Sequence, residues 1–221
     1  KGFIMNHDIT NEVLAEFSTA FSSNPVNRIA MNAVTSAGLL AASKNPMAQR
    51  ESRHSYSISL EQGEITNQKQ SGRCWMFAAL NTFRFEVMKN LNLKTFELSQ
   101  NYTLFYDKLE KSNYFLESIL ETLDEPTQGR LISFLLSAPL GDGGQWDMLC
   151  NLVRKYGVVP KEAMPETVSS SATREMTSAL TRKLREDACR LRKAYADGST
   201  LDELRQKKEA MMEEIYRVLC I

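Results

Sequence analysis

Residues 67–80 read Asn-Gln-Lys-Gln-Ser-Gly-Arg-Cys-Trp-Met-Phe-Ala-Ala-Leu, and the rest of the chain is organised around this stretch. A polar turn that contains Gly72 leads directly into Cys74, where a long apolar run begins. Met76, Leu80 and later apolar residues recur at spacings of four and three, which is typical of an α-helix. The pattern predicts a core helix, hydrophobic nearly all round, whose first turn carries Cys74.

A cysteine in the first turn of a helix lies where its thiolate is most easily stabilised. The first N–H groups of a helix have no carbonyl partners, and the aligned peptide dipoles leave partial positive charge there. The thiolate is the nucleophilic form. Gln68 can return its side-chain N–H toward the thiol, and with the backbone N–H of Cys74 it would donate to an oxyanion. On pattern alone, an inert cysteine packed as a small hydrophobe is the more common case.

A second stretch, residues 140–146 (Leu-Gly-Asp-Gly-Gly-Gln-Trp), holds three glycines within four positions. Glycine lets the backbone pass close to a neighbouring group or adopt positive φ. The simplest interpretation is a tight turn before a helix over residues 145–156. The spacing differs from the G-x-G-x-x-G dinucleotide fingerprint, and no strand is predicted before it.

Helical periodicity covers most of the remaining chain. It predicts helices over residues 8–21, 99–123, 131–138, 145–156, 176–191 and 200–218. The secondary structure of residues 26–42 is less clearly indicated, because Gly38 and several Asn and Thr residues weaken a helix. Residues 56–60 alternate between large apolar residues and serine, which predicts one short strand.

Residues 68–78 resemble the active-site segment of papain-like cysteine proteases, with Gln68, Cys74 and Trp75 in register. The variant Asn-Gln-Lys-x-Ser-Gly-Arg-Cys-Trp resembles the intracellular branch of bleomycin hydrolase and aminopeptidase C. This resemblance implies an α+β, papain-like fold, of which the chain would be the mainly α-helical half that carries the Cys helix, with few short strands. Secreted relatives commonly carry a disulfide cysteine at the position of Ser71, so the serine fits a reducing compartment.

The resemblance also implies roles for individual residues. Cys74 would be the nucleophile, Gln68 would line the oxyanion hole, and Gly143-Gly144 would pair its backbone with that of the substrate. Trp146 resembles the aromatic residue that follows the glycine pair in the family. The resemblance implies that Trp146 and Trp75 both contact the substrate. The implied activity is that of a cysteine-type aminopeptidase, which hydrolyses N-terminal residues of peptides through an acyl-enzyme. The branch is known for hexameric rings, which implies a homo-oligomer at full length.

Such an enzyme also needs an imidazole to take the thiol proton, and usually an amide or carboxylate to hold that ring. The two histidines, His7 and His54, both precede Cys74, whereas the family's His and Asn lie well downstream. We therefore expect the chain to be the first half of such an enzyme and to be inactive by itself.

Three regions are expected on this basis. Residues 1–53 would form an N-terminal helical extension and residues 54–165 the helical half of the papain-like fold, with the Cys helix and the glycine loop. Residues 166–221 would form a helical insertion. The strand-rich half with the His and Asn would lie outside this chain.

Composition narrows the possible partners and compartments. Lys plus Arg equals Asp plus Glu at 27 each, so the net charge suggests no polyanionic partner. The sequence has no apolar run of about 18 residues and no signal-peptide pattern at its start. The four cysteines are widely spaced, which does not suggest a disulfide framework. We expect a cytoplasmic protein that acts on peptides, does not enter a membrane and needs no metal or cofactor.

Residues 182–193 form a locally basic segment. The favoured interpretation is a solvated helix face. The functional alternatives are an assembly surface in an oligomer, or a nucleic-acid-binding surface on a non-catalytic helical scaffold that retains the protease half-fold.

Overall fold

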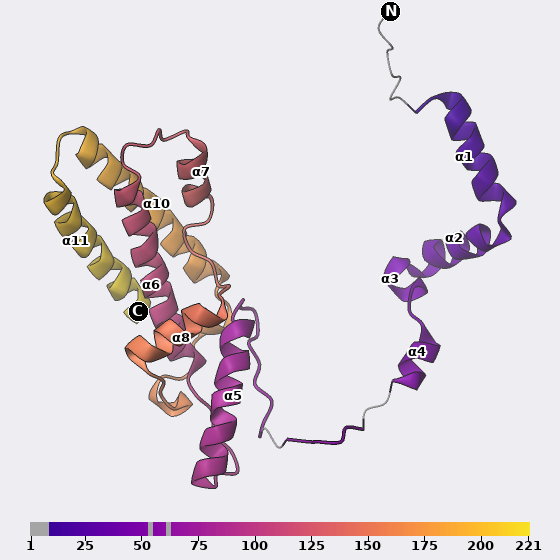
Figure 1. The fold of residues 1–221 in the computed structure, drawn as a ribbon, viewed down its shortest axis with the longest axis horizontal. Helices are drawn as coiled ribbons and strands as arrows, with labels where there is room; N and C mark the ends of the chain where they lie inside the picture. Colours follow the sequence, from indigo (N-terminus) through magenta and orange to yellow (C-terminus); the bar gives the residue numbers. More distant parts are fainter. Residues whose placement is uncertain (1–8, 53–54, 61–62) are drawn as a thin grey trace, which may run out of the picture. The chain divides into compact units, whose positions relative to one another are not determined.

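The computed structural model describes residues 9–52, 55–60 and 63–221, and nearly all of its regular structure is helical (Figure 1). These residues divide into two units, with the boundary between Ser59 and Leu60. Across the described ranges, no helix is both long and apolar enough to cross a lipid bilayer.

The first unit holds four helices, α1 Asn11–Ser23, α2 Pro25–Ala37, α3 Leu39–Ala42 and α4 Pro46–Glu51. The helix predicted over residues 8–21 corresponds to α1, which begins at Asn11 because the Thr10 hydroxyl caps it by accepting the N–H of Val13 at 3.4 Å. Gly38, at φ +80°, separates α2 from α3, so the undecided stretch forms two helices with a glycine break. None of the four helices has a buried residue.

The second unit contains the longer helices. They are α5 Cys74–Leu91, α6 Gln100–Glu121, α7 Arg130–Ser137, α8 Trp146–Tyr156, a 3₁₀ turn at Lys161–Ala163, α9 Val168–Ser171, α10 Arg174–Ala196 and α11 Leu201–Cys220. The predicted helices of this unit are therefore confirmed, with shifts of a few residues at their ends. A capping box forms at the start of α11, where Thr200 and Glu203 bond reciprocally.

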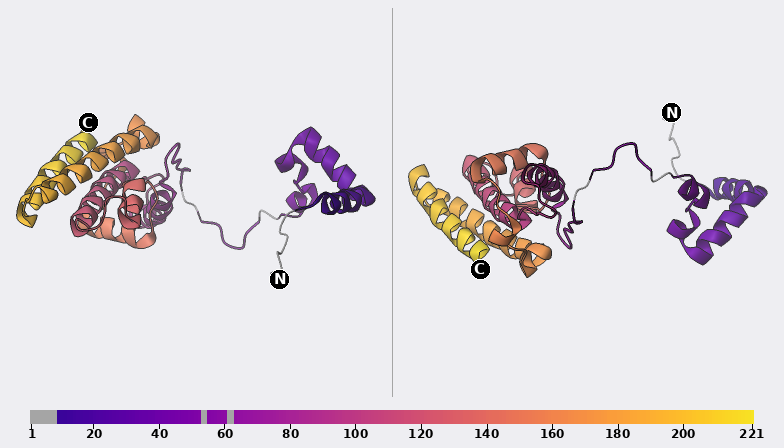
Figure 2. Two further views of the ribbon diagram at one scale, coloured as in Figure 1. Left: turned by 90° about the horizontal axis from the view of Figure 1, so that it is seen from above. Right: turned by 90° about the horizontal axis from the view of Figure 1, so that it is seen from below.

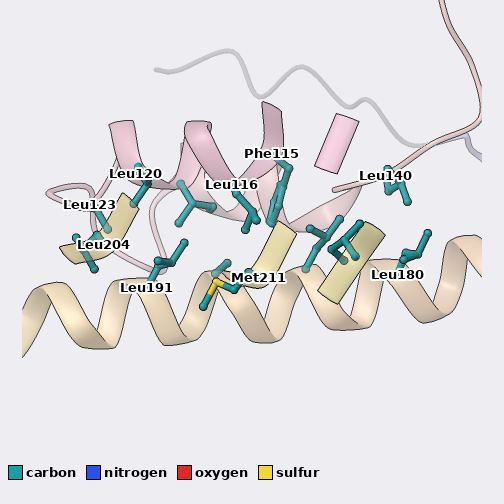
Figure 3. Packing of buried hydrophobic residues seen from close by; sticks show 13 residues of the cluster. Phe115, Leu116, Leu120, Leu123, Leu140, Leu180, Leu191, Leu204 and Met211 are labelled. Atoms are coloured by element: carbon teal, nitrogen blue, oxygen red, sulfur yellow. The ribbon is translucent and has the colours of Figure 1, made fainter. Parts of the chain in front are cut away.

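Helix α6 lies at the centre of the second unit, with α10 and α11 packed along it (Figures 1 and 2). The main hydrophobic core fills the space between these three helices, as Figure 3 shows. Leu116 and Ile119 of α6 meet Leu184 and Leu191 of α10 and Leu204 of α11, and all five are fully buried. Residues after 166 thus contribute a large part of the core.

The Cys helix α5 differs from the expected core rod. Only part of its surface is buried, and its Met76 and Ala79 join a smaller cluster with Leu104 and Leu149. The prediction of a helix that is apolar and buried nearly all round was wrong. Cys74, Ala78, Thr82 and Glu86, spaced four residues apart, are all exposed and mark one open face of α5.

The predicted strand over residues 56–60 does not form. Within the described residues, the only β contacts are two isolated bridges, Gln70 with Ala172 and Leu98 with Pro160. A single extended segment needs a neighbouring strand to bond its N–H and C=O groups. Alternation of residue types alone does not supply that neighbour.

Truncation of a fully buried leucine in this core should lower the stability of the fold. We predict that Leu184→Ala lowers the free energy of unfolding by about 2–5 kcal/mol, because it removes apolar contacts and leaves a cavity between α6, α10 and α11. Urea unfolding followed by circular dichroism measures the change. The matched control is Leu201→Ala, since Leu201 is 57% exposed; an equal loss in both variants would contradict the assigned core.

Candidate active site

Cys74 is the first residue of α5, as predicted. Its thiol is exposed and not in a disulfide. The preceding residue, Arg73, occupies the N-cap position but makes no side-chain cap bond. Because the first N–H groups of a helix have no intrahelical acceptor, the N–H of Cys74 remains a donor at the helix end.

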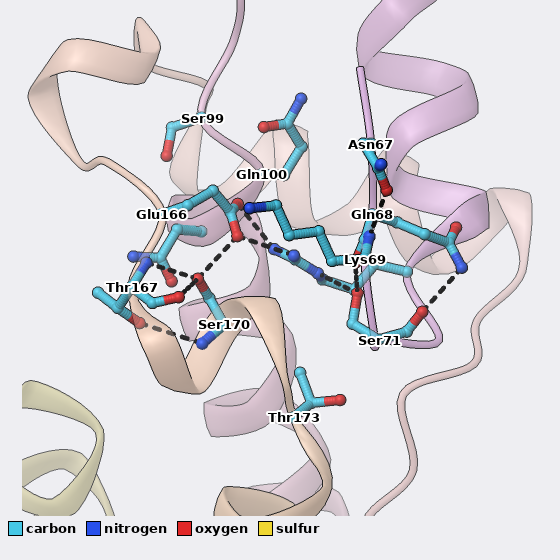
Figure 4. A network of polar contacts seen from close by, with 12 residues as sticks. Asn67, Gln68, Lys69, Ser71, Ser99, Gln100, Glu166, Thr167, Ser170 and Thr173 are labelled. Atoms are coloured by element: carbon cyan, nitrogen blue, oxygen red, sulfur yellow. Dashed lines mark hydrogen bonds and ion pairs between the residues drawn. The ribbon is translucent and has the colours of Figure 1, made fainter. Parts of the chain in front are cut away.

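The side chain of Arg73 is turned into the protein, and a guanidinium has no acceptor atom with which to cap a helix start. The guanidinium is fully buried and makes a bidentate pair with Glu166, with both N–O distances at 2.8 Å (Figure 4). It also lies 5.1 Å from the centre of the Phe77 ring. Burial alone would raise the pKa of Glu166, but the bonds from Arg73 and Ser170 outweigh it and hold that pKa below its ordinary value.

Gln68 lies in the tight loop that leads to Cys74. Its Nε2 donates to the carbonyl of Ser71 at 2.8 Å, and the Ser71 hydroxyl donates back to the carbonyl of Gln68 at 2.6 Å (Figure 4). The Nε of Arg73 donates to that same hydroxyl at 2.8 Å. An amide nitrogen carries two hydrogens, and the bond to Ser71 uses one of them. The structure thus shows where Gln68 is held and leaves the second hydrogen of its amide nitrogen available.

Asp142, the residue between the glycines of the second stretch, connects that loop to the Cys loop. Its carboxylate accepts the backbone N–H of Gly72 at 2.9 Å and the ammonium of Lys108 at 2.6 Å, and also bonds the Thr173 hydroxyl. Burial alone would raise the pKa of Asp142, but these donors hold it well below its ordinary value. A Cβ on Gly72 would lie 2.7 Å from that of Asp142, so the approach requires glycine.

The glycine loop passes directly over the indole of Trp75. A Cβ on Gly144 would lie 2.5 Å from the ring, whereas a Cβ on Gly143 would meet nothing within 4 Å. The Nε1 of Trp75 donates to the carbonyl of Asp142 at 2.8 Å. The expected close approach is therefore present at Gly144. None of the loop glycines has positive φ, so that part of the expectation was wrong.

Lys111 of α6 binds the opposite side of the same loop. Its ammonium donates to the carbonyls of Gly143 at 2.7 Å and Gly141 at 3.0 Å, and to the carboxylate of Asp107 at 2.8 Å. The Asp107 side chain is 2% exposed. Burial raises the pKa of Asp107 to about 6, although Lys111 opposes the shift.

Three further residues bear on the site, namely Trp146 and the two histidines. Trp146 begins α8 and is 62% exposed, next to the glycine loop in sequence. His7 and His54 lie outside the described residues. Over the part of the chain that the structure describes, no three His, Cys, Asp or Glu residues gather into a metal site.

Sequence reasoning missed the charged residues that hold the site together, namely Arg73, Lys108, Lys111, Asp142 and Glu166. One signal was present for Lys108, which stands three and four residues after the buried Phe105 and Leu104. A charge on the apolar face of a helix indicates a buried partner.

Most cations of the basic segment, residues 182–193, bond other groups of the chain. Five of its six cations bond nearby groups: Lys183, Arg185, Arg190, Arg192 and Lys193. Arg185, for example, donates to the carbonyls of Leu136 and Ser137. These bonds favour the interpretation as a structural helix face.

Comparison with known proteins identifies the family of the chain. The model of the peptidase C1-like family matches residues 8–221, and the chain belongs to that family. It is 47% identical over 215 residues to aminopeptidase C of Listeria monocytogenes serovar 1/2a, covering 97% of this chain and 48% of the relative. It is 42% identical over 217 residues to bleomycin hydrolase of Homo sapiens, covering 96% of this chain and 48% of the relative.

The fold comparison gives the same result. A crystal structure of PepW from Lactobacillus rhamnosis HN001 aligns with a TM-score of 0.92 and 46% identity, covering 97% of this chain and 48% of that one. The predicted resemblance to the bleomycin hydrolase and aminopeptidase C branch is thus confirmed. The chain spans about half the length of the curated relatives it matches.

The two adjacent glycines should respond differently to the same substitution. Gly144→Ala drives a methyl group into the indole of Trp75, so we predict a loss of about 1–3 kcal/mol of unfolding free energy. Gly143→Ala places its methyl group in open space at an unstrained φ, so we predict a change within about 0.5 kcal/mol. Urea unfolding of both variants measures the difference, and equal effects would contradict the packing of Gly144 on Trp75.

Asp142→Asn should show a pH-dependent loss of stability. Because the folded pKa of Asp142 is depressed, its carboxylate stabilises the fold above the ordinary pKa near 4, and this contribution disappears as the pH falls through the folded pKa. We predict a loss of roughly 3–5 kcal/mol at pH 7, the cost of leaving Lys108 without its partner, and a smaller loss below about pH 4.

Urea unfolding of wild type and variant at both pH values tests this prediction. The matched control is Asp147→Asn, since Asp147 is an exposed carboxylate in the first turn of α8. A difference between wild type and Asp142→Asn that does not depend on pH would contradict the role of the charge.

Proposed function

We propose that the chain is the nucleophile-bearing half of a cysteine aminopeptidase that removes N-terminal residues from peptides. In this proposal residues 54–165 carry the reacting groups, residues 1–53 are an extension and residues 166–221 are an insertion that braces the site. The single observation that carries it is Cys74, an exposed thiol at the first position of α5, next to a backbone N–H that no side chain caps.

The chemistry follows from that position. The Cys74 thiolate attacks the carbonyl carbon of the peptide bond, so a carbon–sulfur bond forms and the carbonyl oxygen becomes an oxyanion. The N–H of Cys74 and the second N–H of Gln68 stabilise this oxyanion. When the carbon–nitrogen bond breaks, the amine leaves with a proton from the general acid. Water then hydrolyses the thioester and regenerates the thiol.

The glycine loop provides the surface on which the peptide backbone lies. Gly144 is held against Trp75 and leaves its backbone groups available, and Trp146 lies exposed just beyond it. Bonds to the peptide backbone give affinity with little selectivity among side chains, so many peptides would be accepted. The restriction to N-terminal residues is supported by the relatives, which are named aminopeptidase C and bleomycin hydrolase.

The imidazole base would come from the part of the fold that this chain does not span. The matched relatives are about twice as long, which supports this division. General acid–base help is typically worth about 10²–10⁴-fold, so we propose that residues 1–221 alone turn over peptides poorly. We further propose a cytoplasmic, ring-forming homo-oligomer for the intact protein. Nucleic-acid binding has no support from the basic segment, whose cations are mostly bonded within the chain.

Two substitutions test the proposal in the intact protein. Cys74→Ser should abolish peptide hydrolysis, because a hydroxyl is a far weaker nucleophile in this setting. Gln68→Ala should lower kcat by about 10²–10³-fold, the usual effect of removing one oxyanion donor. Hydrolysis of peptides with a free amino terminus measures both.

The matched control is Cys189→Ser, which changes another exposed thiol, on α10. Its activity should equal that of wild type. Undiminished turnover in Cys74→Ser would refute the assignment of the nucleophile.

A further inference from the structure

The ammonium of Lys111 is fully used by contacts to the glycine loop and its neighbours. An ammonium has three N–H donors. The Nζ of Lys111 donates to the carbonyls of Gly143 and Gly141 and to the carboxylate of Asp107, at 2.7, 3.0 and 2.8 Å. The Lys111 side chain is 15% exposed, whereas the two glycines that it bonds lie at the surface.

The bond to Gly143 fixes the direction of the next N–H group. The carbonyl of Gly143 and the N–H of Gly144 belong to one planar trans peptide unit, in which the two groups point in opposite directions. Because the carbonyl points at Lys111, the N–H of Gly144 points away from it. Among the described residues, neither this N–H nor the carbonyl of Gly144 has a hydrogen-bond partner.

Trp75 packs against Gly144, the residue that follows the carbonyl of Gly143. The ring lies against the Cα of Gly144, so closely that a Cβ there would be 2.5 Å away. The ring also lies 5.5 Å from the Lys111 ammonium and bonds the carbonyl of Asp142 through Nε1. The peptide unit between Gly143 and Gly144 is therefore held by a charge at its carbonyl and by an aromatic ring at its Cα.

We propose that Lys111 is a positioning residue, which fixes the peptide unit between Gly143 and Gly144 so that the Gly144 N–H donates to a backbone carbonyl of the bound peptide. This inference rests on the proposed function, in which the glycine loop lines the peptide site. The Asp107 carboxylate also binds the Lys111 ammonium, and it is a buried supporting group.

The test uses the intact protein with the substitution Lys111→Met, which keeps most of the length of the side chain and removes all three donors. We expect KM for a peptide substrate to rise by about tenfold, the value of one backbone hydrogen bond, while kcat stays within about twofold. The rate of Cys74 alkylation by iodoacetamide should stay unchanged, because this small reagent needs no contact with the loop. A purely structural role would change that rate and kcat together.

Two further variants keep the test decisive. Lys155→Met is the matched control, because Lys155 is 62% exposed and pairs with Glu110 rather than with a carbonyl of the glycine loop, and it should leave KM unchanged. If Lys111→Met does not fold, Lys111→Arg takes its place, since a guanidinium can donate to the same carbonyls. We expect Lys111→Arg to keep KM within about threefold of wild type, and a rise of about tenfold or more in it would overturn the inference.

The outcomes separate this inference from the proposed function. An unchanged KM in Lys111→Met, or a joint fall of kcat and of the alkylation rate, overturns the positioning role. Loss of the proposed function would instead show as peptide hydrolysis that survives Cys74→Ser, whatever Lys111→Met does.

Discussion

The geometry of the candidate active site depends on one carboxylate, that of Asp142. It accepts bonds from Gly72 in the Cys loop, from Lys108 on the central helix α6 and from Thr173 at the start of α10. The backbone carbonyl of the same residue accepts the indole N–H of Trp75. A carboxylate largely removed from water is stable only with donors around it, so these four segments are brought to one point.

A second buried pair acts in the same way on the other side of the Cys loop. The side chain of Arg73 is held inward by Glu166. The N–H of Cys74 lies at the helix end, and the loop of Gln68 and Ser71 is bonded to the Arg73 side chain through the Ser71 hydroxyl. Buried ion pairs add little net stability compared with apolar packing. We interpret these two as devices that fix the position of the loops, while the apolar core of α6, α10 and α11 supplies most of the stability.

Local features of the site and fold could be predicted from the sequence, because they depend on neighbours within a few residues. The start of α5 at Cys74 and the capping box at Thr200 follow from short-range spacing. The close approach at the glycine loop follows from the lack of a side chain at Gly144. Family membership could be predicted too, because the motif around Cys74 is dense and continuous.

Features that depend on distant partners could not be predicted. The contact of Gly72 with Asp142 joins residues 70 positions apart, and no spacing rule indicates it. The burial of one side of α5 depends on its packing against α6 and α8, and the place of α6 at the centre depends on where α10 and α11 pack. The strand over residues 56–60 failed for the same reason, since alternation describes one segment and a strand needs two.

The most direct test of the central claim is a crystal structure of the intact protein with a peptide aldehyde bound. The claim is that Cys74, Gln68 and Gly144 form one site, held in place by Asp142. The account predicts a hemithioacetal on the sulfur of Cys74, with its oxygen about 2.7–3.1 Å from the Cys74 N and the Gln68 Nε2. It also predicts that the N–H of Gly144 donates to a carbonyl of the bound peptide. An adduct on another cysteine, or an oxygen turned away from both donors, would contradict it.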